Sequence, residues 1–370
     1  MTVLAQHFWL VLPLTAALSA GLAFLMIPLA RKTGWVDRPG GRKLHLDATP
    51  LVGGMAVYVA LAAAVAVSPI PHLPHHSFCL VMLLGAGALL LTGLIDDLYE
   101  LSATSRFLLQ VGICLLMVQF GNARLEDLGQ LFSGDVLQLG WMSIPITVFA
   151  AMGVINSLNL IDGMDGLSGT LFLVAAGGMA LFAALAGSSA LFWLLLIAMA
   201  SVLGYLLLNA RFPWNEKARV FLGDAGTLML GFLLAWCFIR LGNGPSRAFM
   251  PMTAVWLFAL PLLDTSTVIW RRWREGRSAF SADQNHLHHA FLRAGFSVEQ
   301  TWARISLLAL TLAVFGIGFE LSRLPEWLSF YTFMVMAFAY YFYLKHSWAT
   351  QRFLGRHFIH HDFTFEDWYA

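Results

Sequence analysis

Long apolar runs separated by short polar segments recur along the whole chain. A helix needs ~20 apolar residues to cross the hydrocarbon core of a bilayer, within a working range of about 17 to 25. Runs of that length predict eleven membrane-spanning helices. They lie at 7–30, 51–70, 78–95, 105–121, 141–158, 168–186, 190–209, 223–241, 249–270, 303–321 and 328–345. We therefore expect an all-α polytopic membrane protein that forms one integral membrane domain over residues 1–370.

The composition agrees with a lipid environment. Hydrophobic residues make up 59% of the chain and charged residues 12%, whereas a soluble domain is about half apolar and about a quarter charged. The three cysteines, Cys79, Cys114 and Cys237, each lie inside an apolar run. Their spacing fits neither a disulfide framework nor a metal site, so we interpret them as small buried hydrophobic residues.

The basic residues predict the orientation. If the N-terminus lies outside, 18 of the 22 Lys and Arg residues fall in the inner segments. Those segments are 31–50, 96–106, 156–168, 210–222, 271–304 and 345–370. Because cytoplasmic loops carry an excess of Lys and Arg, this split places the N-terminus outside and the C-terminus in the cytoplasm.

The acidic residues follow the basic ones, and 16 of the 21 lie on or next to the inner side. We expect them to cap the inner ends of helices and to avoid the bilayer midplane, which suits a cytoplasmic site better than an ion pathway. Asp96 and Asp97 end the third span. Adjacent carboxylates repel, so a divalent cation or a nearby arginine should compensate them. A charged helix end in water is the alternative.

A second acidic cluster lies between the fifth and sixth spans. Asn159, Asp162 and Asp165 are three residues apart, so a helical turn would place them on one side. Gly163 and Gly166 let a ligand approach the backbone, and segment 156–168 contains no Lys or Arg. The pattern favours a metal, or a substrate with a hydrogen-bond donor edge, over a plain polar turn.

Asp224 opens the eighth span, with Phe221 three residues before it. An aspartate at a helix start is commonly an N-cap. Here the flanking Gly223 and Gly226 leave room for a flat ring against the phenylalanine.

The last inner loop combines arginines with histidines. Arg271, Arg272, Arg274 and Arg277 precede His286, His288 and His289. Arginine clusters bind phosphates through paired hydrogen bonds, although the positive-inside bias alone also predicts them. The histidines fit hydrogen bonding to a sugar or phosphate better than zinc binding, because the sequence supplies no well-spaced third ligand.

The segment 34–54 is the remaining basic inner segment. Lys43 and His45 are candidates for phosphate binding, and the alternative is an anchor for anionic lipid headgroups. Carboxylates can bind a hard cation such as Mg²⁺, and basic side chains can bind phosphate groups. Together they indicate phosphoryl chemistry at the inner membrane face.

Five stretches also resemble a known family: 34–54, 96–100, 156–167, 221–226 and 264–289. In their order along the chain and in the residues they contain, they resemble the polyprenyl-phosphate N-acetylhexosamine-1-phosphate transferases. The His-Leu-His-His form at 286–289 is most similar to the branch that starts O-antigen and related surface glycans; the peptidoglycan branch has a differently built histidine motif. Glu100 stands where the family motif often has Asp, and it keeps the charge.

The resemblance implies a Mg²⁺-dependent enzyme of the bacterial inner membrane, with Mn²⁺ as a substitute ion. It implies transfer of GlcNAc-1-phosphate from UDP-GlcNAc to undecaprenyl phosphate, with release of UMP and a site that faces the cytoplasm. The bilayer is then the protein's surroundings, nucleic acid is not an expected partner, and a homodimer stays open.

The resemblance also assigns roles by position. Asn159 and Asp224 would bind Mg²⁺, Asp165 would hydrogen-bond the uracil, and Phe221 would stack on it. Asp96 and Asp97 would lie beside the pyrophosphate and the lipid phosphate, with Asp162 in the same catalytic group. The other expected contacts to phosphate and sugar are Lys43, His45, Arg106, Arg272, His286, His288 and His289.

Three alternatives stay open. The sugar could be another N-acetylhexosamine (QuiNAc, FucNAc or GalNAc) or the muramyl pentapeptide. Direct in-line attack by the lipid phosphate is favoured over an aspartyl-phosphate intermediate, because the lipid phosphate is largely ionised at neutral pH. A transporter of lipid-linked sugars would need charges along a midplane path or paired broken helices.

Overall fold

The computed structural model describes residues 2–38, 48–68, 70, 78–132, 134–211, 215–244, 247–278 and 286–345. Its described part is a bundle of α-helices with one small hairpin. The helices are α1 (Thr2–Thr33), α2 (Gly53–Val67), α3 (Phe78–Tyr99), α4 (Ala103–Phe120), α5 (Ser143–Ile161), α6 (Leu167–Leu185), α7 (Ser189–Asn209), α8 (Gly223–Leu241), α9 (Pro251–Leu257), α10 (Ala259–Arg274), α11 (Leu287–Arg293), α12 (Val298–Leu321) and α13 (Glu326–Lys345). A 3-10 turn, η2 (Gly140–Met142), leads into α5.

The bundle confirms the all-α polytopic class. Within the described ranges, nine helices are long and apolar enough to cross a membrane, and α9 with α10 forms a tenth, bent span. The remaining predicted span coincides with α2, which has only 15 residues. Each of the eleven apolar runs therefore corresponds to a helix or a bent helix pair.

The ninth run is not the continuous helix that its hydropathy predicts. It breaks at Phe258, and α9 and α10 meet at 82°. Pro261 in the first turn of α10 gives the physical reason. A proline has no backbone N–H to donate to the carbonyl four residues earlier, here that of Leu257, and its ring clashes with that carbonyl.

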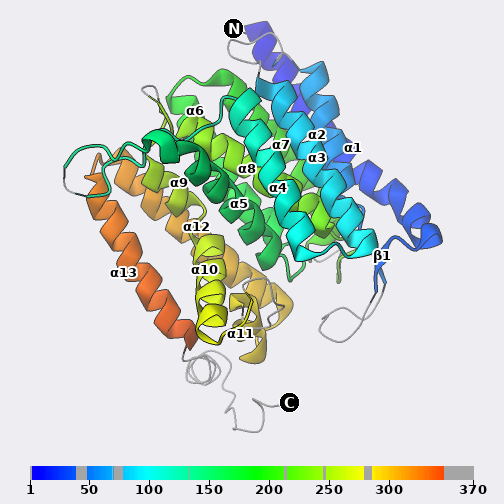
Figure 1. Cartoon of the computed structure of the whole chain (residues 1–370). Helices are drawn as coiled ribbons and strands as arrows, with labels where there is room; N and C mark the ends of the chain where they lie inside the picture. Colours follow the sequence, from blue (N-terminus) through cyan, green and yellow to red (C-terminus); the bar gives the residue numbers. More distant parts are fainter. Residues whose placement is uncertain are drawn as a thin grey trace.

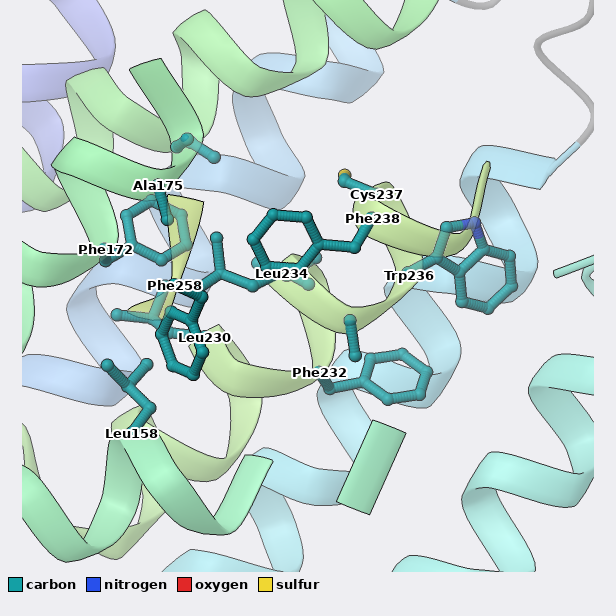
Figure 2. Close-up of a cluster of buried hydrophobic side chains, with 14 of the residues drawn as sticks. Leu158, Phe172, Ala175, Leu230, Phe232, Leu234, Trp236, Cys237, Phe238 and Phe258 are labelled. Carbon is teal, nitrogen blue, oxygen red and sulfur yellow. The ribbon is translucent and has the colours of Figure 1, made fainter. Parts of the chain in front are cut away.

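The helix α8 lies at the centre of the bundle, and 89% of the residues in its most apolar 18-residue stretch are buried. It packs against α2, α3, α5 and α6. Its side chains point to several sides: Phe232 and Trp236 lie together on one side, and Leu230 and Leu234 lie towards Phe258 (Figure 2). The helices α1 and α13 lie at opposite edges of the bundle (Figure 1), and in the most apolar 18-residue stretch of each only 17% of the residues are buried.

The hairpin fixes the start of α8. Strand β1 (Val36–Asp37) pairs antiparallel with β2 (Thr49–Pro50), with Val36 opposite Pro50. The backbone N–H of Phe221 donates to the Pro50 carbonyl at 2.8 Å, and the N–H of Gly53 donates to the Phe221 carbonyl at 2.9 Å. The segment before α8 is thus held between β2 and the start of α2.

The opposite end of the bundle is closed by its own contacts. Arg247 makes a two-pronged ion pair with Asp127, with both N–O distances 2.9 Å. Glu326 accepts hydrogen bonds from the backbone N–H groups of Gln130 (2.6 Å) and Met252 (3.0 Å). These contacts tie the start of α9 to α13 and to the segment 121–139.

Candidate active site

Several helix ends meet around Asp224 at the end of the bundle that carries the hairpin. Arg106, in the first turn of α4, lies 2.7 Å from the Asp96 carboxylate and 3.6 Å from that of Asp224. Asp96 also accepts the backbone N–H of Leu101 at 2.8 Å. Arginine was one of the two groups expected to compensate the adjacent Asp96 and Asp97. Arg106 contacts Asp96 of that pair, and it lies between Asp96 and Asp224.

Asp97 caps the start of α8 from the neighbouring helix. Its carboxylate accepts the backbone N–H groups of Asp224 at 2.9 Å and Ala225 at 3.3 Å. The first N–H groups of a helix have no intrahelical acceptor and carry partial positive charge, so a carboxylate there stabilises the helix. Gly223 makes the approach possible, because a Cβ there would lie 2.6 Å from an Asp97 oxygen.

Asn159 lies directly beside Asp224. Its amide donates to the Asp224 carboxylate at 2.7 Å and to the Thr227 hydroxyl at 2.8 Å. A 180° turn of the amide would present its oxygen at the same place. Among the described residues no group of three or more His, Cys, Asp or Glu forms a metal site. A carboxylate with an amide oxygen nevertheless suits Mg²⁺, which takes few protein ligands and completes its shell with phosphate oxygens and water.

Asp162 caps the end of α5 and faces the same region. Its carboxylate accepts the Ser168 hydroxyl at 2.6 Å. Burial, with the nearby charges of Asp224 and Asp165, raises the pKa of Asp162 to about 7. The half-buried Asp162 thus adds a carboxyl that titrates near neutral pH.

Asp165 is held by a partner that the sequence reasoning missed. Arg211 donates to one Asp165 oxygen at 2.8 Å and contacts Glu299 at 3.2 Å. The N–H of Ala218 approaches the same Asp165 oxygen at 3.3 Å. The sequence signal for this pair was the absence of Lys and Arg from 156–168, because Asp162 and Asp165 then need a cation from another segment. Arg211, just after the seventh span, was the candidate.

The histidines pack against the loop that carries Asp162. The rings of His286 and His288 are parallel, with centroids 5.7 Å apart, and His288 lies 4.1 Å from His289. A Cβ on Gly163 would lie 2.4 Å from Nε2 of His288, so only glycine allows this approach. Burial, and then the neighbouring His289, lowers the pKa of His288 to about 3.

Asp264 is a further acid near this end of the bundle, to which the sequence reasoning assigned no role. It lies inside the ninth apolar run, is fully buried, and hydrogen-bonds His286 at 2.6 Å. Arg272, on the same helix, is 2% exposed. An acid within an apolar span was itself the signal for Asp264, because such groups usually have a partner and a function.

The structure therefore gathers most of the predicted site residues. A chain of contacts joins Asp96 to Arg106, Arg106 to Asp224 and Asp224 to Asn159. Asp97 caps α8, and Phe221 lies half-buried just before that helix. Gly163 connects this group to the histidines. Lys43 and His45 lie outside the described residues.

An all-α bundle with carboxylates, an asparagine, arginines and histidines at one end has the side chains needed to bind a metal ion and phosphorylated substrates. Residues 79–242 match the model of glycosyl transferase family 4. The chain belongs to this family, whose phosphoglycosyl transferases generally depend on a divalent metal, and it is an enzyme of that kind.

Individual relatives extend the similarity over most of the chain. It is 34% identical over 334 residues to the undecaprenyl-phosphate alpha-N-acetylglucosaminyl 1-phosphate transferase of Escherichia coli strain K12, covering 90% of each chain. Proteins of the same name from Salmonella typhimurium (35% over 336 residues, 90% of each chain) and Haemophilus influenzae (34% over 333 residues, 90% and 92%) are similar to it as well. These comparisons confirm the resemblance on which the sequence interpretation rests.

Proposed function

We propose that this protein transfers GlcNAc-1-phosphate from UDP-GlcNAc to undecaprenyl phosphate. The products are undecaprenyl-diphospho-GlcNAc and UMP, and the step begins synthesis of O-antigen or a related surface glycan. The observation that carries the proposal is the chain of contacts that joins Asp96, Arg106, Asp224 and Asn159. The chain is also 34% identical to an undecaprenyl-phosphate alpha-N-acetylglucosaminyl 1-phosphate transferase.

Asn159 and Asp224 would hold Mg²⁺, or Mn²⁺ as a substitute, through one oxygen each. The bound ion would neutralise negative charge on the diphosphate. Arg106 would contact the same diphosphate, since Asp96 holds its guanidinium beside Asp224. Two cationic groups, the metal ion and Arg106, would then face the phosphate oxygens where negative charge develops.

The uracil would bind between Phe221 and Asp165. One Asp165 oxygen is engaged by Arg211 and Ala218, which orients the other oxygen to accept the N–H of the uracil ring. Phe221 would stack on the ring, and its backbone bonds to Pro50 and Gly53 keep it in place. A rigid aromatic face and a fixed acceptor suit a planar base with one donor edge.

The lipid phosphate would attack the β-phosphorus of UDP-GlcNAc directly. A bond forms from its oxygen to that phosphorus, the bond to the bridging oxygen breaks, and UMP leaves. The second pKa of a phosphate monoester is about 6, so the attacking oxygen is largely ionised without a strong base. Asp96 and Asp97 already accept hydrogen bonds from Arg106, Leu101 and the start of α8, which favours positioning over an aspartyl-phosphate intermediate.

The remaining predicted contacts complete the site. Arg272 and the His286–His289 segment would bind phosphate and sugar, and Lys43 and His45, which lie outside the described residues, would add phosphate contacts. The loops 31–50, 96–106, 156–168, 210–222 and 271–304 would then form the cytoplasmic face of the site. The basic bias supports an outer N-terminus and a cytoplasmic C-terminus in a bacterial inner membrane. A homodimer remains a prediction.

The transporter alternative gains one feature and lacks another. A broken helix exists, at α9 and α10. A transporter of this type would need two broken helices in corresponding positions. The described residues contain only one broken helix. Asp264, the acid within that span, is occupied by hydrogen bonds to its neighbours. The enzyme is therefore the better supported function.

The test is a product assay with purified protein in detergent. We expect Mg²⁺-dependent UMP release from UDP-GlcNAc only when undecaprenyl phosphate is present, with the lipid-diphospho-sugar identified by mass spectrometry. Release from another UDP-sugar, but not from UDP-GlcNAc, would keep the chemistry and overturn the sugar. No release from any nucleotide sugar by folded protein would overturn the proposal.

A further inference from the structure

Asp264 forms a buried hydrogen-bond network outside the group around Asp224. The side chain has no solvent exposure. One carboxylate oxygen accepts the backbone N–H of Leu287 at 2.9 Å and the Tyr340 hydroxyl at 3.0 Å. The other lies 2.6 Å from Nδ1 of His286. Three parts of the chain, α10, the start of α11 and α13, thus converge on one carboxylate.

The chemistry of a carboxylate fixes where the His286 proton lies. An ionised carboxylate only accepts hydrogen bonds. At 2.6 Å the contacting nitrogen of His286 must therefore carry the hydrogen, so the ring is protonated at Nδ1. The other nitrogen, Nε2, is then the only one that can contact a substrate.

The orientation of His286 also matters for its neighbours. His286 and His288 are 4% and 2% exposed, and their rings are parallel. Both ring nitrogens of His288 lack a hydrogen-bond partner among the described residues, and its Nε2 faces Gly163. His288 thus lies between His286 and the loop that carries Asp162.

We propose that Asp264 is a positioning residue for the transferase: it keeps the proton of His286 on Nδ1 and so presents Nε2 to the nucleotide sugar. A partner that sets the tautomer and direction of a functional histidine is a recurring device, and its loss costs activity without removing a reacting group. The catalytic part of this inference rests on the proposed function. The proton position does not, because it is a property of the protein alone.

The decisive variant is Asp264→Asn. The Leu287 N–H can only donate, so the asparagine oxygen stays on that side and still serves Tyr340. The amide NH₂ then faces His286 and donates to Nδ1, which forces the proton to Nε2. Tyr340→Phe is the matched control within the network, because it removes one bond to Asp264 and leaves the carboxylate facing His286. Glu326→Gln changes a buried acid at the opposite end of the bundle.

The first measurement is nitrogen NMR of full-length protein labelled with ¹⁵N-histidine, with His286→Gln assigning the signal. We expect Nδ1 protonated in the wild type and in Tyr340→Phe, and Nε2 protonated with Nδ1 bare in Asp264→Asn. A bare Nδ1 in the wild type would overturn the proposal, and this observation needs only the assigning variant His286→Gln to fold, whether or not Asp264→Asn does.

The second measurement is steady-state UMP release. We expect Asp264→Asn to lower kcat by about 100-fold with a smaller change in KM, and Glu326→Gln to stay within about 3-fold of wild type after correction for folded protein. An equal loss in both variants, or full activity in Asp264→Asn, would contradict positioning. If the wild type itself releases no UMP, the proposed function fails, and the NMR result still decides the proton position.

Discussion

The two ends of the helix bundle hold their acidic residues in different ways. At the end with α9 and α13, Asp127 has its own arginine, and Glu326 accepts two backbone N–H groups. At the end with the hairpin, Asp96 and Asp224 share Arg106. Asp162 lies close enough to Asp224 and Asp165 for their charges to raise its pKa.

This difference separates a structural arrangement from a functional one. Asp127 and Glu326, each with its own partners, close the far end of the bundle. Acids that share a cation leave excess negative charge, which folding alone does not favour and which a bound divalent ion would compensate. This difference supports the proposal that the reaction takes place at the hairpin end, and each experiment below changes the acids or their partners at one of the two ends.

The largest effect is expected from Asp224→Asn. The substitution keeps the size of the side chain and removes the charge that would hold Mg²⁺. We expect UMP release to fall by about 1000-fold, the upper range for loss of one electrostatic contact in an active site. Asp135→Asn is the matched control, because it removes the charge of an exposed acid at the other end. Equal rates of UMP release by Asp224→Asn and Asp135→Asn would contradict the proposed difference between the two ends of the bundle.

Arg106→Gln should cost less, about 100-fold in kcat/KM. Its guanidinium neutralises Asp96 and approaches Asp224, so the variant leaves the acids more repulsive and the diphosphate with one contact fewer. The measurement is the Mg²⁺ dependence of UMP release. A variant with wild-type kcat/KM at every Mg²⁺ concentration would exclude Arg106 from the site.

Arg247→Gln should act on stability and spare the chemistry. It leaves the Asp127 carboxylate, 7% exposed, without its cation, and breaking a buried pair costs about 3 to 5 kcal/mol. We expect a clear fall in the melting temperature in detergent, with kcat of the folded fraction within about 3-fold of wild type. A large loss of kcat with unchanged melting would show that the far end takes part in the reaction.

The smallest effect concerns pH. The pKa of Asp162 is raised to about 7 in the fold, whereas an aspartate in an unfolded chain has a pKa of about 3.9. Between these values the folded state binds more protons, so stability falls as pH rises. In EDTA, the melting temperature of wild type relative to Asp162→Asn should therefore decrease from about pH 4 to about pH 7. A difference that grows in the opposite direction would contradict the burial of this carboxyl.

The sequence predicted the helices well because a membrane-spanning helix needs a long apolar run, and every run but the ninth corresponds to a single helix. It did not predict the break at Phe258, since hydropathy ignores the missing N–H of Pro261. The acids of the site were visible because charge is rare in this chain. Their partners were not, because the bonds from Asp97 to Asp224, Asp165 to Arg211 and Asp264 to Tyr340 join residues 127, 46 and 76 positions apart.

Binding of Mn²⁺ to purified protein, followed by electron paramagnetic resonance, tests the central claim most directly. We expect the wild type and Asp135→Asn to bind one Mn²⁺ per chain that Mg²⁺ displaces, and Asp224→Asn to lose that binding. Mn²⁺ binding that is unchanged in Asp224→Asn would contradict the account, because the acids at the hairpin end would then not hold the ion.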